Sequence, residues 1–227
     1  MLWATIILLL RRYRRSHPRE FERLLARAVF VARLMVLLLL AMSCTLYAHT
    51  QTKNLAYSIK QNGKVVGTLH VKEAAAKGKV SYHVQSHVQT RFLISFDIKA
   101  VEEAHFENNI LVASSIRRTM NGSEKKDQSI LLQGNRYEVN NSGKKELLSI
   151  YPIRHTLLSL YLYEPLHYSQ IFSDVFQRLL PVQKVAPHHY KVSFPDGAYN
   201  EFFYSKGVCT KIIIHNTLYK AIIELKA

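Results

Sequence analysis

Apolar and polar side chains alternate along the chain from Leu55 onward, which is the period of a β-strand with one buried face. Leu55, Tyr57 and Ile59 share one face, and the residues between them share the other. Positions 61–64 read Gln-Asn-Gly-Lys, a strong hairpin signal because Asn and Gly tolerate the positive φ angles of a type I′ turn. Turn signals recur roughly every dozen residues, a spacing typical of an antiparallel meander.

Most of the chain beyond residue 54 fits this pattern. In the longest alternating segment, Val80 and Tyr82 face one side while His83 and His87 face the other. An alanine-rich stretch at 73–78 is predicted as a loop or a single helical turn. The predicted strands cover residues 55–60, 65–72, 80–89, 92–99, 110–120, 128–133, 137–139, 147–150, 190–194, 199–204, 209–215 and 219–225.

Two segments between residues 155 and 180 break the alternation. The first covers 155–164 and stops at Pro165, and the second covers 168–180 and stops at Pro181. In the second, apolar residues recur at helical spacing, and Ser169 is available as an N-cap. We therefore predict one or two helices around 155–180, packed by an apolar stripe on the sheet.

The fold class that follows is mainly β, with a single domain over residues 49–227. Ten or more antiparallel strands either expose two edges or close on themselves, so we predict a strongly curved sheet or a closed or near-closed barrel. A helix lying across such a sheet makes a groove of the kind that often binds apolar ligands. The candidate groove residues are the aromatic side chains around the predicted helices, namely Tyr161, Tyr163, Tyr168, Phe172 and Phe176.

The first 48 residues differ from the rest in charge. They hold eight arginines, no lysine and two acidic residues, and an apolar run at 34–42 follows Arg33. A positive flank, a short apolar centre and a small residue at the cut site are typical of a secretory signal. We predict cleavage after Ala48 and an exported, periplasmic or secreted protein, with lipidation of Cys44 as the alternative. The run is shorter than the roughly 20 residues that span a bilayer.

The basic residues 1–33 precede that signal and allow two interpretations. They are either an amphipathic segment lying on anionic lipid or sequence upstream of a translation start within 29–35, and we favour the second. Arginines commonly contact nucleic acid, but more than half of them lie within residues 1–48. Together with the predicted export, this argues against a nucleic-acid partner for the domain.

No catalytic or metal-binding signature occurs in the sequence. His83 and His87 share a strand face, but four strand positions span roughly 13 Å, too far apart to bind one ion. Glu102 and Glu103 are adjacent and would face opposite sides of a strand. There is no phosphate-binding glycine loop, dinucleotide fingerprint or nucleophile elbow. We therefore predict no catalytic residue, cofactor or metal, and we expect Cys209 to be a buried apolar residue.

Several short motifs resemble those of an uncharacterised family of exported bacterial β-rich proteins. They are Tyr57 to Lys60 with Asn62, Gly63, Lys64 and Gly67; Phe106, Leu111, Ser114 and Ser115; Asn121-Gly122; Leu160-Tyr161 with Glu164-Pro165; and Pro195-Asp196-Gly197, Asn200, Tyr204 and Gly207. More remotely, the chain resembles curved-sheet envelope proteins of the lipoprotein-localisation type. The resemblance covers most of residues 54–226 and implies a fold but no catalytic residues.

The expected function is therefore that of an exported envelope module, non-catalytic, which binds an apolar or amphipathic small ligand or a lipid, or serves a structural role. Two alternatives remain open. One is an enzyme in which several of His70, His83, His105, His188 and His215 converge in a pocket. The other is a protein-interaction module that uses an exposed strand edge. No oligomeric state is predicted.

Overall fold

The computed structural model describes residues 22, 27, 29–36, 51–91, 95–217 and 219–226. The chain divides into two compact units, residues 1–49 and 50–227. In the first unit, residues 29–36 are helical, and no helix among the described residues is long and apolar enough to cross a membrane. The predicted cleavage after Ala48 and the alternative lipidation of Cys44 lie outside the described residues.

The second unit is built on one antiparallel sheet of fourteen strands in the order β8-β7-β6-β5-β4-β3-β2-β1-β14-β13-β12-β11-β10-β9. This confirms the predicted mainly β meander. The strands are β1 Gln51–Gln61, β2 Lys64–Ala76, β3 Lys79–Arg91, β4 Ser95–Glu107, β5 Ile110–Met120, β6 Ser123–Gln133, β7 Arg136–Asn141, β8 Lys144–Leu148, β9 Gln170–Ser173, β10 Arg178–Ala186, β11 His189–Ser193, β12 Tyr199–Ser205, β13 Val208–His215 and β14 Lys220–Leu225.

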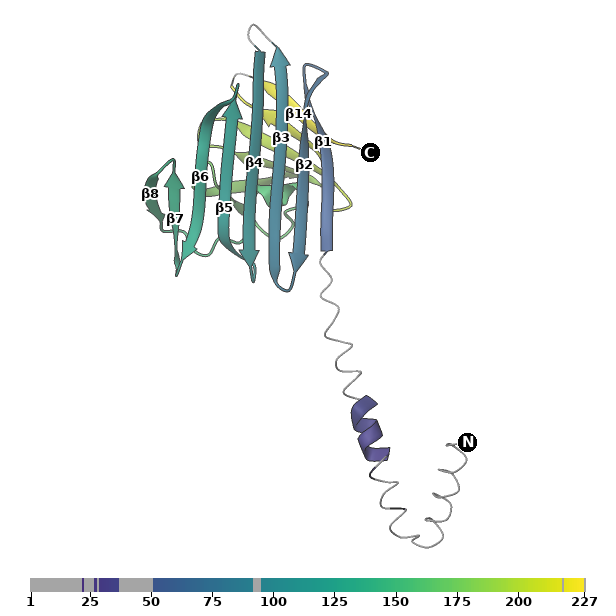
Figure 1. Ribbon diagram of the computed structural model, residues 1–227. Helices are drawn as coiled ribbons and strands as arrows, with labels where there is room; N and C mark the ends of the chain where they lie inside the picture. Colours follow the sequence, from purple (N-terminus) through teal and green to yellow (C-terminus); the bar gives the residue numbers. More distant parts are fainter. Residues whose placement is uncertain are drawn as a thin grey trace. The chain divides into compact units, whose positions relative to one another are not determined.

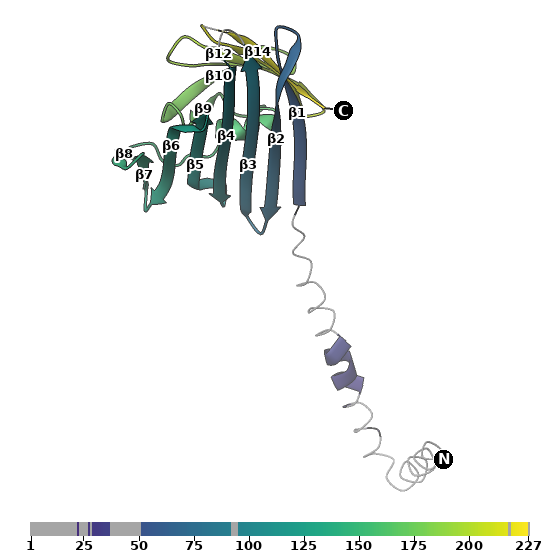
Figure 2. The same cartoon turned by 45° about the horizontal axis from the view of Figure 1, so that its top comes forward.

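The sheet curves so strongly that its two halves face each other. Strands β10–β14 cross behind β1–β6 at a steep angle (Figures 1 and 2). The halves join where β1 pairs with β14, Tyr57 lying opposite Leu225. The sheet does not close between β8 and β9. Instead, Phe172 of β9 donates its backbone N–H to the His155 carbonyl at 2.9 Å, so the chain before the helix covers that edge and a closed barrel is not formed.

The first predicted hairpin is confirmed at residues 61–64, where Asn62 and Gly63 have φ angles of 50° and 76°. Gly67 is required for a different reason. A Cβ atom at this position would lie 2.2 Å from the backbone oxygen of His87 on the neighbouring strand. Two β-strands approach each other here more closely than any side chain allows.

One helix is present in the 155–180 region, but it is a short 3₁₀ helix, η1 Leu157–Tyr161. The helix predicted at 168–180 is wrong, because this segment forms β9, a turn and β10. Backbone pairing on both sides of β9, to β10 and to Thr156, overrides the helical spacing of its apolar residues. The loop or helical turn predicted at 73–78 is also wrong up to Ala76. These residues extend β2, with Glu73 paired between Lys53 and Tyr82.

Helix η1 forms part of the core between the two halves of the sheet. It contacts β3 and β4 on one half and β9 and β13 on the other, and Leu158 and Leu160 are buried. Buried tyrosine hydroxyls bind its backbone from both halves. Tyr57 donates to the carbonyl oxygens of Tyr161 and Cys209, at 3.1 and 2.9 Å, and Tyr204 donates to that of Leu160 at 2.8 Å.

Candidate functional site

A cleft opens on the inner face of the sheet at the end where two turns meet. The turn after β2 and the turn after β4 are joined by a hydrogen bond of 2.8 Å from Asn108 N–H to the Gly78 carbonyl. The segment before η1 is held beside them, because Leu111 N–H donates to the Ile153 carbonyl at 2.9 Å. The sheet and the η1 segment therefore form opposite walls of one opening.

The cleft has a volume of about 300 Å³ and combines an aromatic wall with a polar rim. Tyr82 and Phe106, in neighbouring strands, meet edge to face with ring centroids 5.8 Å apart. Such an arrangement suits a ligand with an apolar body and few polar groups. The lining residues are Val80, Tyr82, Phe106, Asn109, Arg154, His155, Ser159, Tyr163 and Tyr168.

His155 and Tyr168 stack within this lining, with ring centroids 4.0 Å apart and planes 10° from parallel. Burial, together with the charge of Arg154, lowers the pKa of His155, so its imidazole is neutral at physiological pH. Burial raises the pKa of Tyr168, and the neighbouring Ser159 hydroxyl opposes this shift. The stacked pair and Ser159 therefore place polar groups on the wall opposite Val80 and Phe106.

Glu73 supports the cleft from behind. Its side chain is almost completely buried, and its Oε1 accepts a hydrogen bond from the Tyr163 hydroxyl at 2.8 Å. Lys53 donates to the same hydroxyl at 2.7 Å and lies 3.8 Å from Glu73 Oε1. Burial and, second, the charge of Glu73 raise the pKa of Tyr82. The carboxylate thus fixes the position of one cleft tyrosine and keeps another protonated.

A second group of polar side chains lies on β4, β5, β6 and the β9–β10 turn. Asp174 accepts a hydrogen bond from Ser114, and its backbone carbonyl accepts one from Gln128 at 2.6 Å. Burial raises the pKa of Asp174 to about 6, with a smaller contribution from Glu102 and opposing ones from Ser114 and Lys126. Burial also raises the pKa of Glu102, whose carboxylate lies 3.7 Å from Arg118.

The five aromatic residues predicted for a groove do not lie together. Tyr163 and Tyr168 line the cleft. Tyr161 packs against Tyr57 with ring centroids 5.9 Å apart. Phe172 is fully buried in the core, and Phe176 stacks on Phe194. The other three are not part of the cleft lining, and a ligand role for any of the five stays a prediction.

The histidines named for an enzymatic site do not converge in one pocket. His70 and His83 border a separate depression of about 280 Å³ lined from β1, β2 and β3. His105 contacts Ser81 at 2.9 Å, His188 contacts Glu164, and His215 contacts Glu201 at 2.7 Å. Among the described residues, no group of three His, Cys, Asp or Glu side chains is placed to hold a metal ion.

Cys209 is buried, as expected from the strand pattern. Burial raises the pKa of its thiol to about 12, with the nearby backbone of Lys211 and Phe203 opposing this shift. A thiol with so high a pKa is protonated at physiological pH, and the thiolate is the reactive form. Cys209 therefore has the properties of a core residue.

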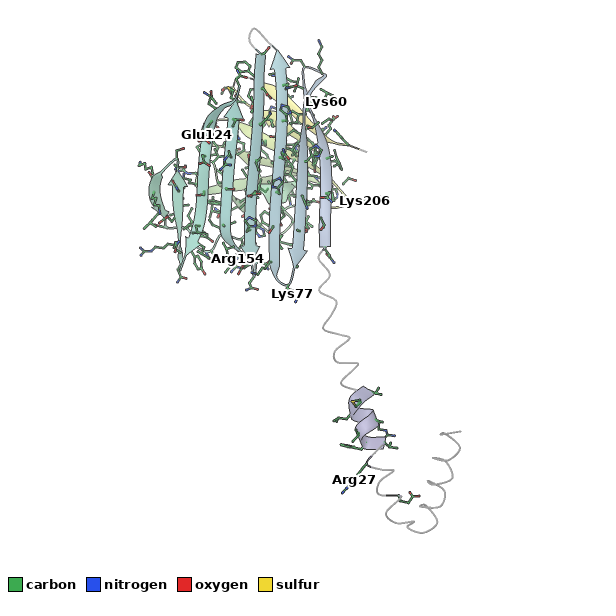
Figure 3. All side chains as sticks on the ribbon, viewed as in Figure 1. Arg27, Lys60, Lys77, Glu124, Arg154 and Lys206 are labelled. Atoms are coloured by element: carbon green, nitrogen blue, oxygen red, sulfur yellow. The ribbon has the colours of Figure 1, made fainter. Side chains whose placement is uncertain are left out.

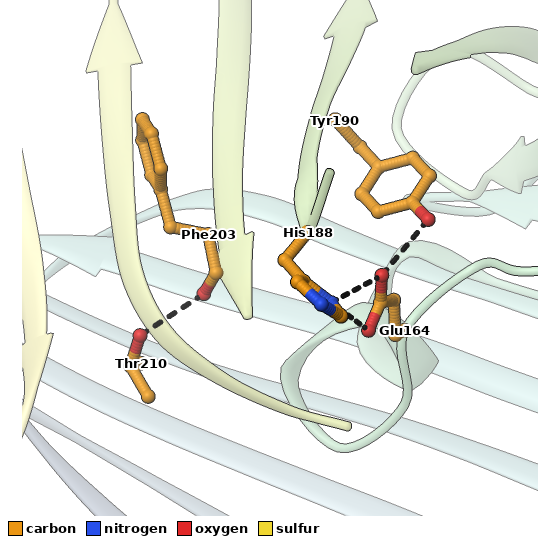
Figure 4. A network of polar contacts seen from close by, with 5 residues as sticks. All are labelled: Glu164, His188, Tyr190, Phe203 and Thr210. Carbon is orange, nitrogen blue, oxygen red and sulfur yellow. Dashed lines mark hydrogen bonds and ion pairs between the residues drawn. The ribbon is translucent and has the colours of Figure 1, made fainter. Parts of the chain in front are cut away.

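Glu164 anchors the chain that follows η1, as Figure 4 shows. Its side chain is 5% exposed and binds His188 Nδ1 at 3.0 Å, while the Tyr190 hydroxyl donates to it at 2.9 Å. Its backbone N–H donates to the Gly207 carbonyl at 3.1 Å. Motif residues far apart in the sequence thus hold η1 and its flanking chain in place. They are Tyr57, Leu160, Tyr161, Glu164, Tyr204 and Gly207.

The Glu164→Gln substitution is expected to lower the free energy of unfolding by about 1–3 kcal/mol, since it weakens charge-assisted bonds to a buried carboxylate. Glu146→Gln is the matched control, because the Glu146 side chain is 46% exposed and its one ion pair among the described residues is with Lys144 on an edge strand. Its effect should stay within about 0.5 kcal/mol. Urea denaturation measures both, and equal losses would contradict an anchoring role for Glu164.

Sequence reasoning missed several residues of the cleft and its support. Glu73 fell in an alanine-rich stretch predicted as loop or helical turn, although its pairing with Lys53 and Tyr82 places it in the sheet. Arg154 and Ser159 belong to no recognisable motif, because their place in the cleft lining depends on where the η1 segment packs. The alternation did predict that Val80 and Tyr82 share one face of a strand, and both line the cleft.

Comparisons with known proteins give a family and a similar structure. Residues 57–226 match the family described as a domain of unknown function, DUF6134, as expected from the resemblance to an uncharacterised β-rich family. A search of curated protein sequences found no match. Among solved structures, the chain is similar to the beta-barrel-like protein of domain of unknown function DUF1849 from Brucella abortus. The two are 8% identical, the match covers 76% of this chain and 94% of that one, and the TM-score is 0.49.

Proposed function

Since the chain belongs to the DUF6134 family, whose description assigns no activity, we propose its function from the cleft: a non-catalytic module that binds a small amphipathic ligand. The observation that carries this proposal is the opening of about 300 Å³ walled by Val80, Tyr82 and Phe106 and rimmed by polar groups. Ligand pockets are typically concave, mostly apolar and supplied with a few polar groups that orient the ligand.

The placement of η1 limits what the interior can hold. The space between the two halves of the sheet is filled by Leu158, Leu160 and the residues packed on them. A long acyl chain would have to displace this segment, whose backbone is bound by Tyr57 and Tyr204. The cleft at the end of the sheet instead suits a ligand with one compact apolar body.

We place this activity outside the cytoplasm as part of the same proposal. The support is the sequence of residues 33–48, where Arg33, a short apolar run and Ala48 make a secretory signal. A periplasmic or secreted module of this kind would meet small amphipathic molecules of the envelope. Detection of the native protein in a periplasmic or secreted fraction, with a mature N-terminus after Ala48, tests the location.

Ligand binding in the cleft is tested with N-phenyl-1-naphthylamine, a neutral aromatic probe whose fluorescence rises in apolar surroundings. The Val80→Trp substitution fills the cleft and is expected to weaken probe binding by at least about tenfold. Val65→Trp is the matched control, because Val65 is 63% exposed and lies outside the cleft lining. Equal binding by the chain and both variants would refute the cleft as the binding site.

A further inference from the structure

We propose that the cleft binds an amphipathic anion, and that Arg154 binds the anionic group of that ligand. This inference rests on the proposed function, because it names the class of ligand for the same cleft. Arg154 is exposed, borders the opening, and forms no ion pair with another described residue. Its guanidinium is therefore free to form the bidentate hydrogen bonds that arginine makes with carboxylates and similar anions, beside a wall that suits an apolar body.

The charges around the mouth favour an anion over a cation. Lys77 and Arg154 lie at the same end of the strands, as Figure 3 shows, and both are exposed. The acidic residues nearby are already engaged. Glu107 binds Lys79 at 2.7 Å, and Glu73 is buried behind Tyr163. The side chains that a ligand meets at the opening therefore carry net positive charge, which attracts and orients an anion.

Neutral polar groups at the same rim complete a site for an acidic head group. Asn109 lines the cleft in the β4–β5 turn, and its side-chain amide can donate a hydrogen bond. The uncharged imidazole of His155 can do the same from the opposite wall. Two oxygens of a carboxylate or sulfonate placed between them can accept the paired N–H groups of Arg154, while the apolar body of the ligand contacts Val80, Tyr82 and Phe106.

The size of the cleft selects a free small molecule over a membrane lipid. Its volume of about 300 Å³ lies at the lower end of the range for ligand pockets. Such a space holds one short chain or a pair of fused rings, whereas a phospholipid carries two long chains. The occupant that the structure favours is thus a soluble acid with a single apolar body.

The test compares two probes that share one apolar body and differ by a single sulfonate group, 8-anilinonaphthalene-1-sulfonate and N-phenyl-1-naphthylamine. The sulfonate is expected to bind the full chain about tenfold more tightly than the neutral probe, and added salt should reduce this preference. Arg154→Gln should remove the preference, because it should weaken binding of the sulfonate about tenfold more than binding of the neutral probe. Arg117→Gln is the control, since the Arg117 side chain is 69% exposed and is not part of the cleft lining.

Failure of this inference is distinguishable from failure of the proposed function. Equal affinities for the two probes, or an equal loss of both in Arg154→Gln, would overturn the role of Arg154. The Val80→Trp experiment would still decide whether the cleft binds ligands. Displacement of the sulfonate by decanoate supports a free acid. Displacement of the sulfonate by phosphatidylglycerol vesicles, with no effect of decanoate, would overturn the free acid as the ligand and indicate that the site binds a membrane surface.

Discussion

Replacing Leu160 with alanine is expected to lower the free energy of unfolding by about 2–5 kcal/mol, the range found when a buried leucine is truncated. Leu160 is 0% exposed and lies in η1, which contacts strands of both halves of the sheet. The paired strands around it hold their backbones in place, so they collapse only partly into the cavity. For a domain of this size, the melting temperature should fall by roughly 2–4 °C per kcal/mol.

Leu166→Ala provides the matched control for this experiment. Leu166 lies in the chain that follows η1 but is 60% exposed, so the same chemical change should alter stability by no more than about 0.5 kcal/mol. Thermal melts followed by circular dichroism measure both variants under one set of conditions. A small, equal effect of the two substitutions would show that η1 does not stabilise the packing between the two halves of the sheet.

Much of the sheet could be predicted because its signals are local. The Asn62-Gly63 turn and the alternation of Val80 and Tyr82 depend only on neighbouring residues and on which face is buried. The same reasoning failed at 168–180, where the helical spacing of Ile171, Phe172 and Val175 was misleading. Both sides of β9 are buried, so adjacent apolar residues occur in a strand and imitate a helix.

The cleft was only partly predictable for a related reason. Tyr163 and Tyr168 were identified because aromatic residues gather around the break in the strand pattern, and both line the cleft. Phe172 carries the same aromatic signal but lies in the core, since β9 pairs with β10 on one side and with Thr156 on the other. Arg154 and Glu73 come from segments 81 positions apart in the sequence. They contribute to the same cleft only because the η1 segment folds across the sheet: Arg154 lines the cleft, and Glu73 binds the lining residue Tyr163.

The Asp174→Asn substitution is expected to stabilise the protein at neutral pH. Burial raises the pKa of Asp174 from 3.8 to about 6, so the folded protein holds this proton more tightly than the unfolded chain. The ionised carboxylate therefore opposes folding above pH 6, and this destabilisation shrinks as the pH falls from about 6 toward 3.8. At full ionisation, the pKa difference between the folded and unfolded states corresponds to a loss of about 3 kcal/mol of stability. Since asparagine also loses the attraction of Lys126, we expect a gain of about 1–3 kcal/mol.

Urea denaturation of Asp174→Asn and the unchanged chain at pH 7.5 and pH 4.5 measures this gain, which should be larger at the higher pH. Asp127→Asn is the control, because the Asp127 side chain is 47% exposed, and its effect should be small at both values. A gain that grows as the pH falls, or a loss of stability at neutral pH, would contradict the assigned pKa.

A gain at neutral pH would mean that the protein keeps a buried carboxylate in its β9–β10 turn at a cost to stability. Proteins accept that cost chiefly where a charged group serves binding or chemistry.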